Sequence, residues 1–520
     1  MAIIGRGTWI DKLASEMVAR EGDLGRDTSM MRVESGLGAS GIPHVGSIGD
    51  AVRAYGVALA LQDAGYGSEL IAYSDDLDGL RKVPAGMPAS LEDEIARPVS
   101  RIPDPDGCHG SFGEHMSAAL LEGLDMLGVR YDHRRAGSSY GAGLFREQAD
   151  RILSRAGEVG RIISETTGQT KYESVLPYFA ICGGCGRIYT TVPLWYRGGR
   201  VGYACRDARV GGRDVPGCGH EGEADVSRDD GKLAWKAEFA ARWAAFDVRF
   251  EAYGKDIMES VRSNDRISGQ VLGHPHPYHV KYEMLLDEGG KKISKSAGNV
   301  ITAQRWLEFG TPQSLLLLLY KRIGGAREVG FSDIPELVNE YAGLERSYFG
   351  GGGTGNGARD ARSRGLYEYA NLLSPPGAPS PHADYAVVAE LCSIYREDRA
   401  ERVAAKLAEY GMIREGDDVG RLVEMAGRFA DEFGGRGHAE VEVDDAGREA
   451  LTDVAAALRG GAGDIQGMIY EAARANGMAP RDLFRLIYQV ILGRPRGPKL
   501  GPFIEDMGTG RVASMIERHL

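Results

Sequence analysis

Two short segments of the chain combine residue types that could hold the phosphates of a nucleotide. The first reads Pro-His-Val-Gly-Ser at residues 43–47, between a glycine-rich loop and a stretch with helical spacing. A helix N-terminus offers unpaired N–H groups and the positive end of a dipole, which suits a phosphate. The candidate contacts are Pro43, His44, Gly46 and Ser47. The alternative is an ordinary helix start that happens to contain a histidine.

The second segment, Lys-Lys-Ile-Ser-Lys-Ser at residues 291–296, follows two glycines. Its ammonium groups could clamp a polyphosphate and neutralise charge as it moves onto a leaving group. The candidate contacts are Lys292, Ser294, Lys295 and Ser296. A solvated surface loop is the alternative.

Four cysteines form a third candidate site. Cys182 and Cys185 are separated by two glycines, and Cys205 and Cys218 follow. A Cys-x₂-Cys knuckle with two later ligands suits a tetrahedral structural zinc, whereas a redox-active pair is the alternative. His220 could replace Cys205 or Cys218 as a ligand.

The pattern of apolar residues predicts an α/β region followed by helices. Residues 30–34 and 69–73 have the character of strands, and residues 47–64 between them have helical spacing. Such a unit binds ligands beyond the carboxyl ends of its strands. Beyond about residue 334 the spacing is mostly helical, as in residues 387–410, 448–458 and 482–492.

Composition favours a soluble cytoplasmic protein. The 520 residues are 43% hydrophobic and 26% charged, with a formal net charge of −12. We find neither a secretory signal nor an apolar run of the roughly 20 residues that a membrane span needs. The negative charge disfavours a surface covered in nucleic-acid-binding residues, although a local basic face remains compatible with it.

The two phosphate-handling segments resemble the paired HIGH and KMSKS signatures of class I aminoacyl-tRNA synthetases. The resemblance is strongest to the class I lysyl-tRNA synthetases of the archaeal type. It covers roughly residues 8–345 and includes residues 74–84, 101–105, 111–115 and 235–243.

This resemblance implies a Rossmann-like parallel-sheet catalytic domain with a zinc-bearing insertion, followed by an all-α C-terminal domain. The expected divisions are residues 1–100 and 226–334 for the two catalytic halves, 101–225 for the insertion and 335–520 for the helical anticodon-binding region. The implied reaction uses ATP with Mg²⁺ to convert L-lysine to lysyl-adenylate and then loads tRNA(Lys). His44, Lys292 and Lys295 would be the catalytic residues.

The resemblance also implies a second zinc site and a lysine pocket. The second site would use Asp104, Cys108, His109 and His115, a group that spacing alone leaves undecided. A lysine pocket needs carboxylates for its ammonium groups, and the candidates at the predicted strand ends are Glu34, Asp75 and Asp76, with Trp235 as a wall. For each of these residues a structural role is equally compatible with the sequence.

Two departures from the family pattern stand out. Ile257 occupies a position where many members have histidine, and Phe239-Ala240 replaces a common Trp-Pro. The alternatives that remain are a synthetase for another amino acid, a nucleotidylyltransferase and a non-catalytic zinc-bearing RNA-binding relative. For tRNA, residues 474–520 hold eight Lys/Arg against four Asp/Glu, which gives a local charge of +4.

Overall fold

A computed structural model describes residues 3–283, 285–286, 300–351, 354–434, 441 and 443–520. The chain divides into two compact units. The first comprises residues 1–306, 312–333 and 350–376, and the second comprises residues 307–311, 334–349 and 377–520. None of the described helices is both long and apolar enough to cross a lipid bilayer.

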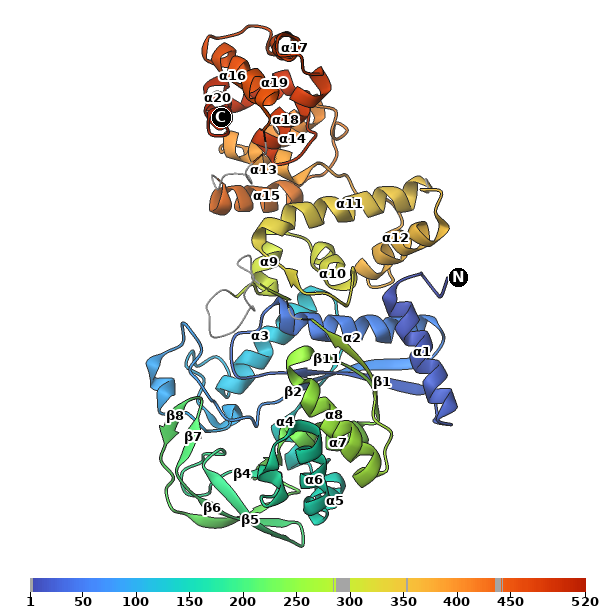
Figure 1. The fold of residues 1–520 in the computed structure, drawn as a ribbon, viewed down its shortest axis with the longest axis vertical. Coiled ribbons are helices and arrows are strands. Elements are labelled where there is room, and N and C mark those ends of the chain that lie inside the picture. The colour runs from blue at the N-terminus through green and yellow to red at the C-terminus, as the bar shows by residue number, and fades with distance from the viewer. Residues whose placement is uncertain (1–2, 284, 287–299, 352–353, 435–440, 442) are drawn as a thin grey trace. The chain divides into compact units, whose positions relative to one another are not determined.

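The first unit is built on a five-stranded sheet in which every pairing is parallel (Figure 1). The strand order is β12-β11-β1-β2-β3. The strands are β1 (Met30–Leu37), β2 (Gly67–Ser74), β3 (Asp132–Arg135), β11 (Val248–Gly254) and β12 (Tyr278–Tyr282). The chain runs outward from β1 through β2 to β3 and then returns to the other side of β1. Open parallel sheets bind their ligands outside the carboxyl ends of the strands at which the order reverses, and here those strands are β1 and β11.

Helices cover both faces of the sheet (Figure 1). One face carries α2 (Val45–Asp63), and α7 (Trp235–Phe246) and α8 (Met258–Ile267) lie on the other. Both faces of a parallel sheet must be covered because its strands are apolar on both sides. Residues of α2 are buried along almost its whole length, which matches its position between the sheet and α1 (Trp9–Asp23).

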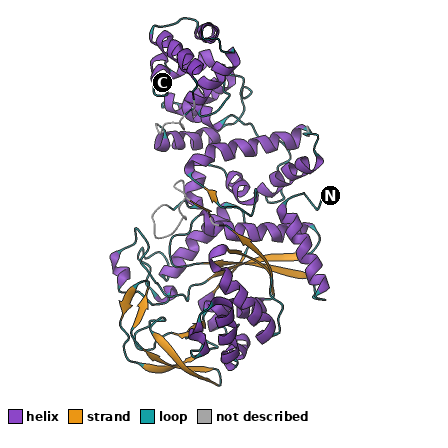
Figure 2. Ribbon diagram, viewed as in Figure 1, coloured by secondary structure: helices purple, strands orange, loops and turns teal. Residues whose placement is uncertain are grey.

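The segment between β3 and α7 contains three α-helices and small antiparallel sheets, and Figure 2 shows both kinds of element there. The helices are α4 (Ala136–Gly141), α5 (Arg146–Ser154) and α6 (Ala156–Thr167). The largest of the small sheets joins β5 (Thr191–Arg197), β6 (Arg200–Cys205) and β9 (Glu221–Asp225). Two further pairs, β4 (Tyr178–Ala180) with β10 (Gly231–Leu233) and β7 (Ala208–Val210) with β8 (Arg213–Val215), complete this region.

The second unit is helical throughout its described residues (Figure 2). It includes α11 (Ile334–Gly350), α13 (Tyr385–Ile394), α14 (Arg399–Glu409), α15 (Gly420–Phe433), α16 (Asp445–Arg459), α17 (Ile465–Ala475), α18 (Pro480–Leu492), α19 (Leu500–Met507) and α20 (Thr509–Glu517). The expected α/β region followed by helices is therefore confirmed. One helical stretch, residues 387–410, is instead two helices, because the chain turns at Asp398 with a left-handed φ of 47°.

Candidate active site

The early candidate segment lies at the start of α2, after the loop that leaves the carboxyl end of β1. His44 is the N-cap residue, and its Nδ1 accepts hydrogen bonds from the N–H groups of Gly46 (3.1 Å) and Ser47 (3.3 Å). A neutral imidazole that accepts at Nδ1 carries its proton on Nε2. The residues were expected to offer backbone N–H groups to a phosphate. The structure instead uses two of those groups to fix the histidine ring, so that Nε2–H becomes the donor.

The late candidate segment, with Lys292, Ser294, Lys295 and Ser296, lies outside the described residues. The chain after it returns to α2, because the backbone N–H of Val45 donates to the carbonyl of Ile301 at 2.8 Å. Ile301 is five residues beyond Ser296, and an extended chain of that length reaches at most about 18 Å. Ile301, on the far side of that segment in the sequence, is therefore fixed beside the residue that follows His44.

The chain before the late segment also contacts α2. Tyr282, the last residue of β12, lies under the Arg53 guanidinium, whose Cζ is 4.9 Å from the ring centroid. Arg53 itself pairs with Asp50 at 3.5 Å. Both flanks of the late segment thus meet the first half of α2.

A buried ion network joins helix α7 to strands β1 and β11. Arg242 on α7 forms ion pairs with Glu34 on β1 and with Glu251 on β11, the latter at 3.1 Å. Burial raises the pKa of Glu34 to about 8, against the opposing effect of Arg242. The carboxylate of Glu34 is fully buried, and the Arg242 guanidinium is its cation. Glu34 was expected at the end of its strand, but pairing with β2 continues to Leu37, so it lies within β1.

A second buried network surrounds Lys232, whose Nζ contacts three carboxylates. The distances are 2.6 Å to Asp75, 2.9 Å to Asp78 and 2.9 Å to Glu238. The side chain of Lys232 is 1% exposed. These carboxylates hold the pKa of Lys232 well above its ordinary value despite burial, and burial raises the pKa of Glu238 to about 7.

The other residues expected in the pocket have protein partners too. Asp75 accepts a hydrogen bond from the Trp235 indole at 2.9 Å. Asp76 accepts from Arg135 Nε (2.9 Å) and from the backbone N–H of Gly137 (2.7 Å). The structure therefore brings Asp75 and Trp235 together, whereas Asp76 faces β3 and α4.

Four charged residues of this site escaped prediction from the sequence: Lys232, Glu238, Arg242 and Glu251. One signal was available. Glu238 and Arg242 are four residues apart on a helix whose other residues are largely apolar, and that spacing places them on one face.

The two departures from the family pattern share an apolar cluster. Ile257 packs against it, and Phe239 is a buried member whose ring lies 5.9 Å from that of Trp235 and 6.2 Å from that of Trp243. An apolar residue at position 257 is therefore consistent with its surroundings.

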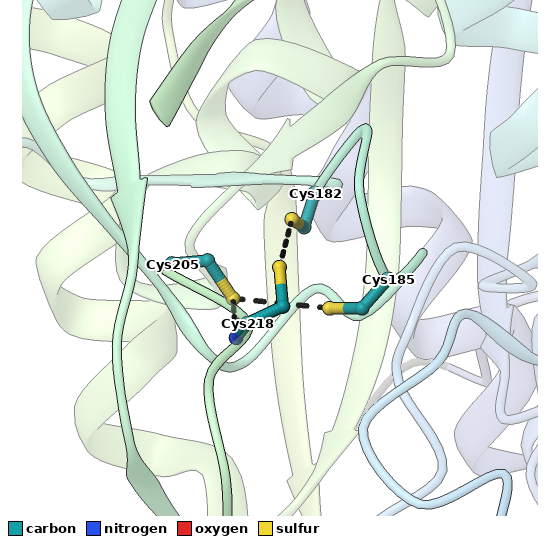
Figure 3. A group of neighbouring side chains, drawn as sticks. All are labelled: Cys182, Cys185, Cys205 and Cys218. Carbon is teal, nitrogen blue, oxygen red and sulfur yellow. Dashed lines mark hydrogen bonds between the residues drawn. The ribbon is translucent and has the colours of Figure 1, made fainter. Parts of the chain in front are cut away.

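The four predicted cysteine ligands converge in the insertion (Figure 3). The Sγ atoms of Cys182 and Cys218 are 3.5 Å apart, and those of Cys185 and Cys205 are 3.8 Å apart. Four thiolates around zinc at about 2.3 Å would be separated by about 3.8 Å, so the spacing fits this ion. A hydrogen bond from the His220 backbone lowers the pKa of Cys218 to about 7, which favours the thiolate that binds metal.

The second predicted group also converges. The side chains of Asp104, Cys108, His109 and His115 place one donor atom each within 4.8 Å of the others. The Sγ of Cys108 lies 3.1 Å from His109 Nδ1 and 3.3 Å from His115 Nδ1. Burial opposes ionisation of Asp104, but hydrogen bonds from the backbone N–H groups of His109 and Asp106 hold its pKa well below the usual range. These donors suit zinc as well.

The fold and these residues define a class of protein: an α/β protein with a parallel sheet, a histidine at the start of α2 and buried carboxylates around Lys232 and Arg242. Comparison with known proteins makes the assignment more specific. The family model described as "tRNA synthetases class I (K)" matches residues 7–373. This chain therefore belongs to that class I tRNA synthetase family.

Individual relatives cover the whole chain. A lysine–tRNA ligase of Cenarchaeum symbiosum (strain A) is 58% identical over 521 aligned positions, which cover 99% of each chain. A lysine–tRNA ligase of Roseobacter denitrificans is 30% identical and covers 94% of this chain and 91% of its own. Among solved structures, a glutamate tRNA ligase of Elizabethkingia meningosepticum has 12% identity and a TM-score of 0.38, with 94% of this chain and 99% of its own covered.

The Lys232 network gives a stability prediction. Lys232→Ala leaves Asp75, Asp78 and Glu238 buried without their cation, which should destabilise the first unit by about 3–5 kcal/mol. Chemical denaturation followed by tryptophan fluorescence measures this loss. The control is Lys12→Ala, because the exposed pair of Lys12 with Glu16 is worth at most about 1 kcal/mol. Equal stability of both variants would contradict the role of Lys232.

The cysteine cluster gives a metal prediction. Cys182→Ser should lower the zinc content of the purified chain by one ion, because it removes one of four thiolate ligands. Elemental analysis of desalted protein measures this difference. Cys392→Ser is the matched control, since Cys392 is a buried cysteine of the helical unit outside this cluster. An unchanged zinc content in Cys182→Ser would rule out the site.

Proposed function

We propose that this chain is a lysine–tRNA ligase. It activates L-lysine with ATP to lysyl-adenylate and transfers the lysyl group to the 3′-terminal adenosine of tRNA(Lys). Full-length relatives with 58% identity carry that name, and the geometry of the site supports each of the three substrates. A reaction that supplies translation would take place in the cytoplasm.

The observation that carries the ATP proposal is the hydrogen bond from Val45 N to the Ile301 carbonyl. It supports convergence of His44 with Lys292 and Lys295 on the phosphates of one nucleotide. His44 would donate from Nε2 to the α-phosphate, because its Nδ1 accepts from Gly46 and Ser47. The two lysines would hold the β- and γ-phosphates. Mg²⁺ would supply further charge neutralisation on those phosphates.

The excess of buried carboxylates over cations near β1 and α7 supports the binding of a cationic amino acid. Glu34 and Glu251 share one arginine, and Asp75, Asp78 and Glu238 share one lysine. The raised pKa values of Glu34 and Glu238 mean that protons partly offset this surplus at neutral pH. An ammonium group of lysine would replace those protons as the positive charge beside the carboxylates. Asp75 and Trp235, which contact each other, would line the same pocket.

The chemistry needs positioning more than covalent help. A carboxylate oxygen of lysine attacks the α-phosphorus, the bond from that phosphorus to the bridging oxygen breaks, and pyrophosphate leaves with the electron pair. A hydroxyl of the terminal adenosine then attacks the lysyl carbonyl, and AMP leaves. The Nε2–H of His44 and the charges of Lys292 and Lys295 would stabilise the first transition state.

The helical unit supports tRNA binding. A pocket of about 300 Å³ is lined by Arg481, Phe484, Arg485, Tyr488, Pro495 and Arg496. Guanidinium groups attract phosphates, and aromatic rings stack on unpaired bases. Within the basic segment of residues 494–499, Arg494 is already paired with Asp384 of the same unit. Arg496 is therefore the better candidate for contact with RNA.

ATP–pyrophosphate exchange with each of the twenty amino acids tests the proposed function. We expect lysine to support exchange, and the assay should be run with and without tRNA. Exchange with another amino acid would assign a different specificity to the same site. Absence of exchange under every condition would favour the non-catalytic RNA-binding alternative.

Lys295 provides a test of the phosphate clamp. Lys295→Ala should slow lysine-dependent exchange by about 10²–10³, the usual loss for one preorganised charge-stabilising group. Lys291→Ala is the control, since Lys291 lies outside the proposed pair, and its effect should be much smaller. An unchanged exchange rate in Lys295→Ala would remove this residue from the mechanism.

A further inference from the structure

A third group of metal-binding side chains lies at the edge of the parallel sheet, away from the two groups described above. It combines Asp265 on α8 with His276, in the loop before β12, and with His279 on β12. One donor atom of each residue lies within 4.8 Å of the others. We propose that these three residues bind a divalent transition-metal ion of the zinc type.

The hydrogen bonds of His279 require a positive charge at this place. Its Nδ1 lies 3.1 Å from the backbone carbonyl of Glu251, so Nδ1 carries a proton and donates it. The Nε2 of a neutral ring is then a lone pair, yet it faces Asp265 Oδ1 at 2.9 Å. Two acceptors at that distance repel each other unless a cation lies between them or the ring takes a second proton.

The arrangement matches how proteins orient histidine ligands. A metal-binding histidine typically donates its other ring N–H to a carbonyl, which fixes the tautomer and the ring. The backbone carbonyl of Glu251 serves this purpose for His279. The carbonyl of Pro277 lies 2.8 Å from His276 Nδ1, so that the ligand atom of His276 would be Nε2. The His279 side chain is 10% exposed and lies against Trp243 and Tyr253, so its position is set before a metal binds.

The distances suit a small metal ion with imidazole ligands. Zinc bonds of about 2.0–2.2 Å separate tetrahedral ligands by about 3.4 Å. The observed distance from Asp265 Oδ1 to His279 Nε2 is 2.9 Å, and one donor atom of His276 lies within 4.8 Å of the other two residues. Two imidazoles and one carboxylate favour zinc over magnesium or calcium, which prefer oxygen ligands. Water would complete the coordination on the side of His276, whose side chain is 43% exposed.

Such an ion would join α8 to β12, the strand at the end of the sheet order. The chain leaves β12 at Tyr282 and reaches Lys291 nine residues later (291 − 282). The metal would therefore fix the strand from which the late lysine segment departs.

Zinc stoichiometry tests the site in the full-length chain. Wild-type protein and the variant His276→Ala/His279→Ala are incubated with a small excess of zinc, desalted and analysed for zinc per chain. We expect the variant to hold one zinc fewer than the wild type. His274→Ala is the matched control, because His274 belongs to the same short stretch but contacts Arg26 instead of this group. Its zinc content should equal that of the wild type.

A second variant guards against loss of folding. Asp265→Asn changes a side chain that is 25% exposed and keeps its shape, and it should weaken zinc binding at this site at least about tenfold. Circular dichroism confirms that each variant is folded. Equal zinc content and affinity in wild type and a folded Asp265→Asn protein would overturn the proposal. The contact between His279 and Asp265 would then be an imidazolium–carboxylate ion pair.

Discussion

The buried guanidinium of Arg242 is the contact on which the arrangement of the site depends. It reaches from α7 to Glu34 on β1 and to Glu251 on β11, the two strands between which the sheet order reverses. A buried charge is tolerated only with such partners, so these residues hold the strands and the helix in a fixed relation. The same helix begins at Trp235, beside the carboxylates that surround Lys232. These contacts therefore hold the sheet, helix α7 and the carboxylates around Lys232 together.

The start of α2 has a different character. There the N–H groups of Gly46 and Ser47 donate to His44, and that of Val45 donates to the carbonyl of Ile301. The Nε2–H of His44 is therefore held in place by the protein before any nucleotide binds. Prepositioned donors cost no reorganisation during the reaction, which is why such sites stabilise developing charge well. In the proposed reaction, the buried carboxylates would serve the cationic amino acid and His44 would serve the phosphates.

Metal-binding groups recur at the periphery of this unit. The cysteine cluster ties together short strands of the insertion, which are too small to be stable as isolated sheets. The group around Asp104 orders a loop just before α3 (Phe112–Met126).

The sequence by itself determined most local elements and indicated the grouping of the four cysteines, because period-3.6 patterns and Cys-x₂-Cys spacing are short-range signals. It also singled out Asp75 and Trp235, through the need of a lysine side chain for carboxylates at strand ends and for an apolar wall. Only the tertiary structure decided which charges meet. Lys232 and Asp75 are 157 positions apart. Arg242 on α7 contacts Glu34 on β1, an element far away in the chain. Long-range pairing of buried charges depends on strand order, and no local pattern encodes that order.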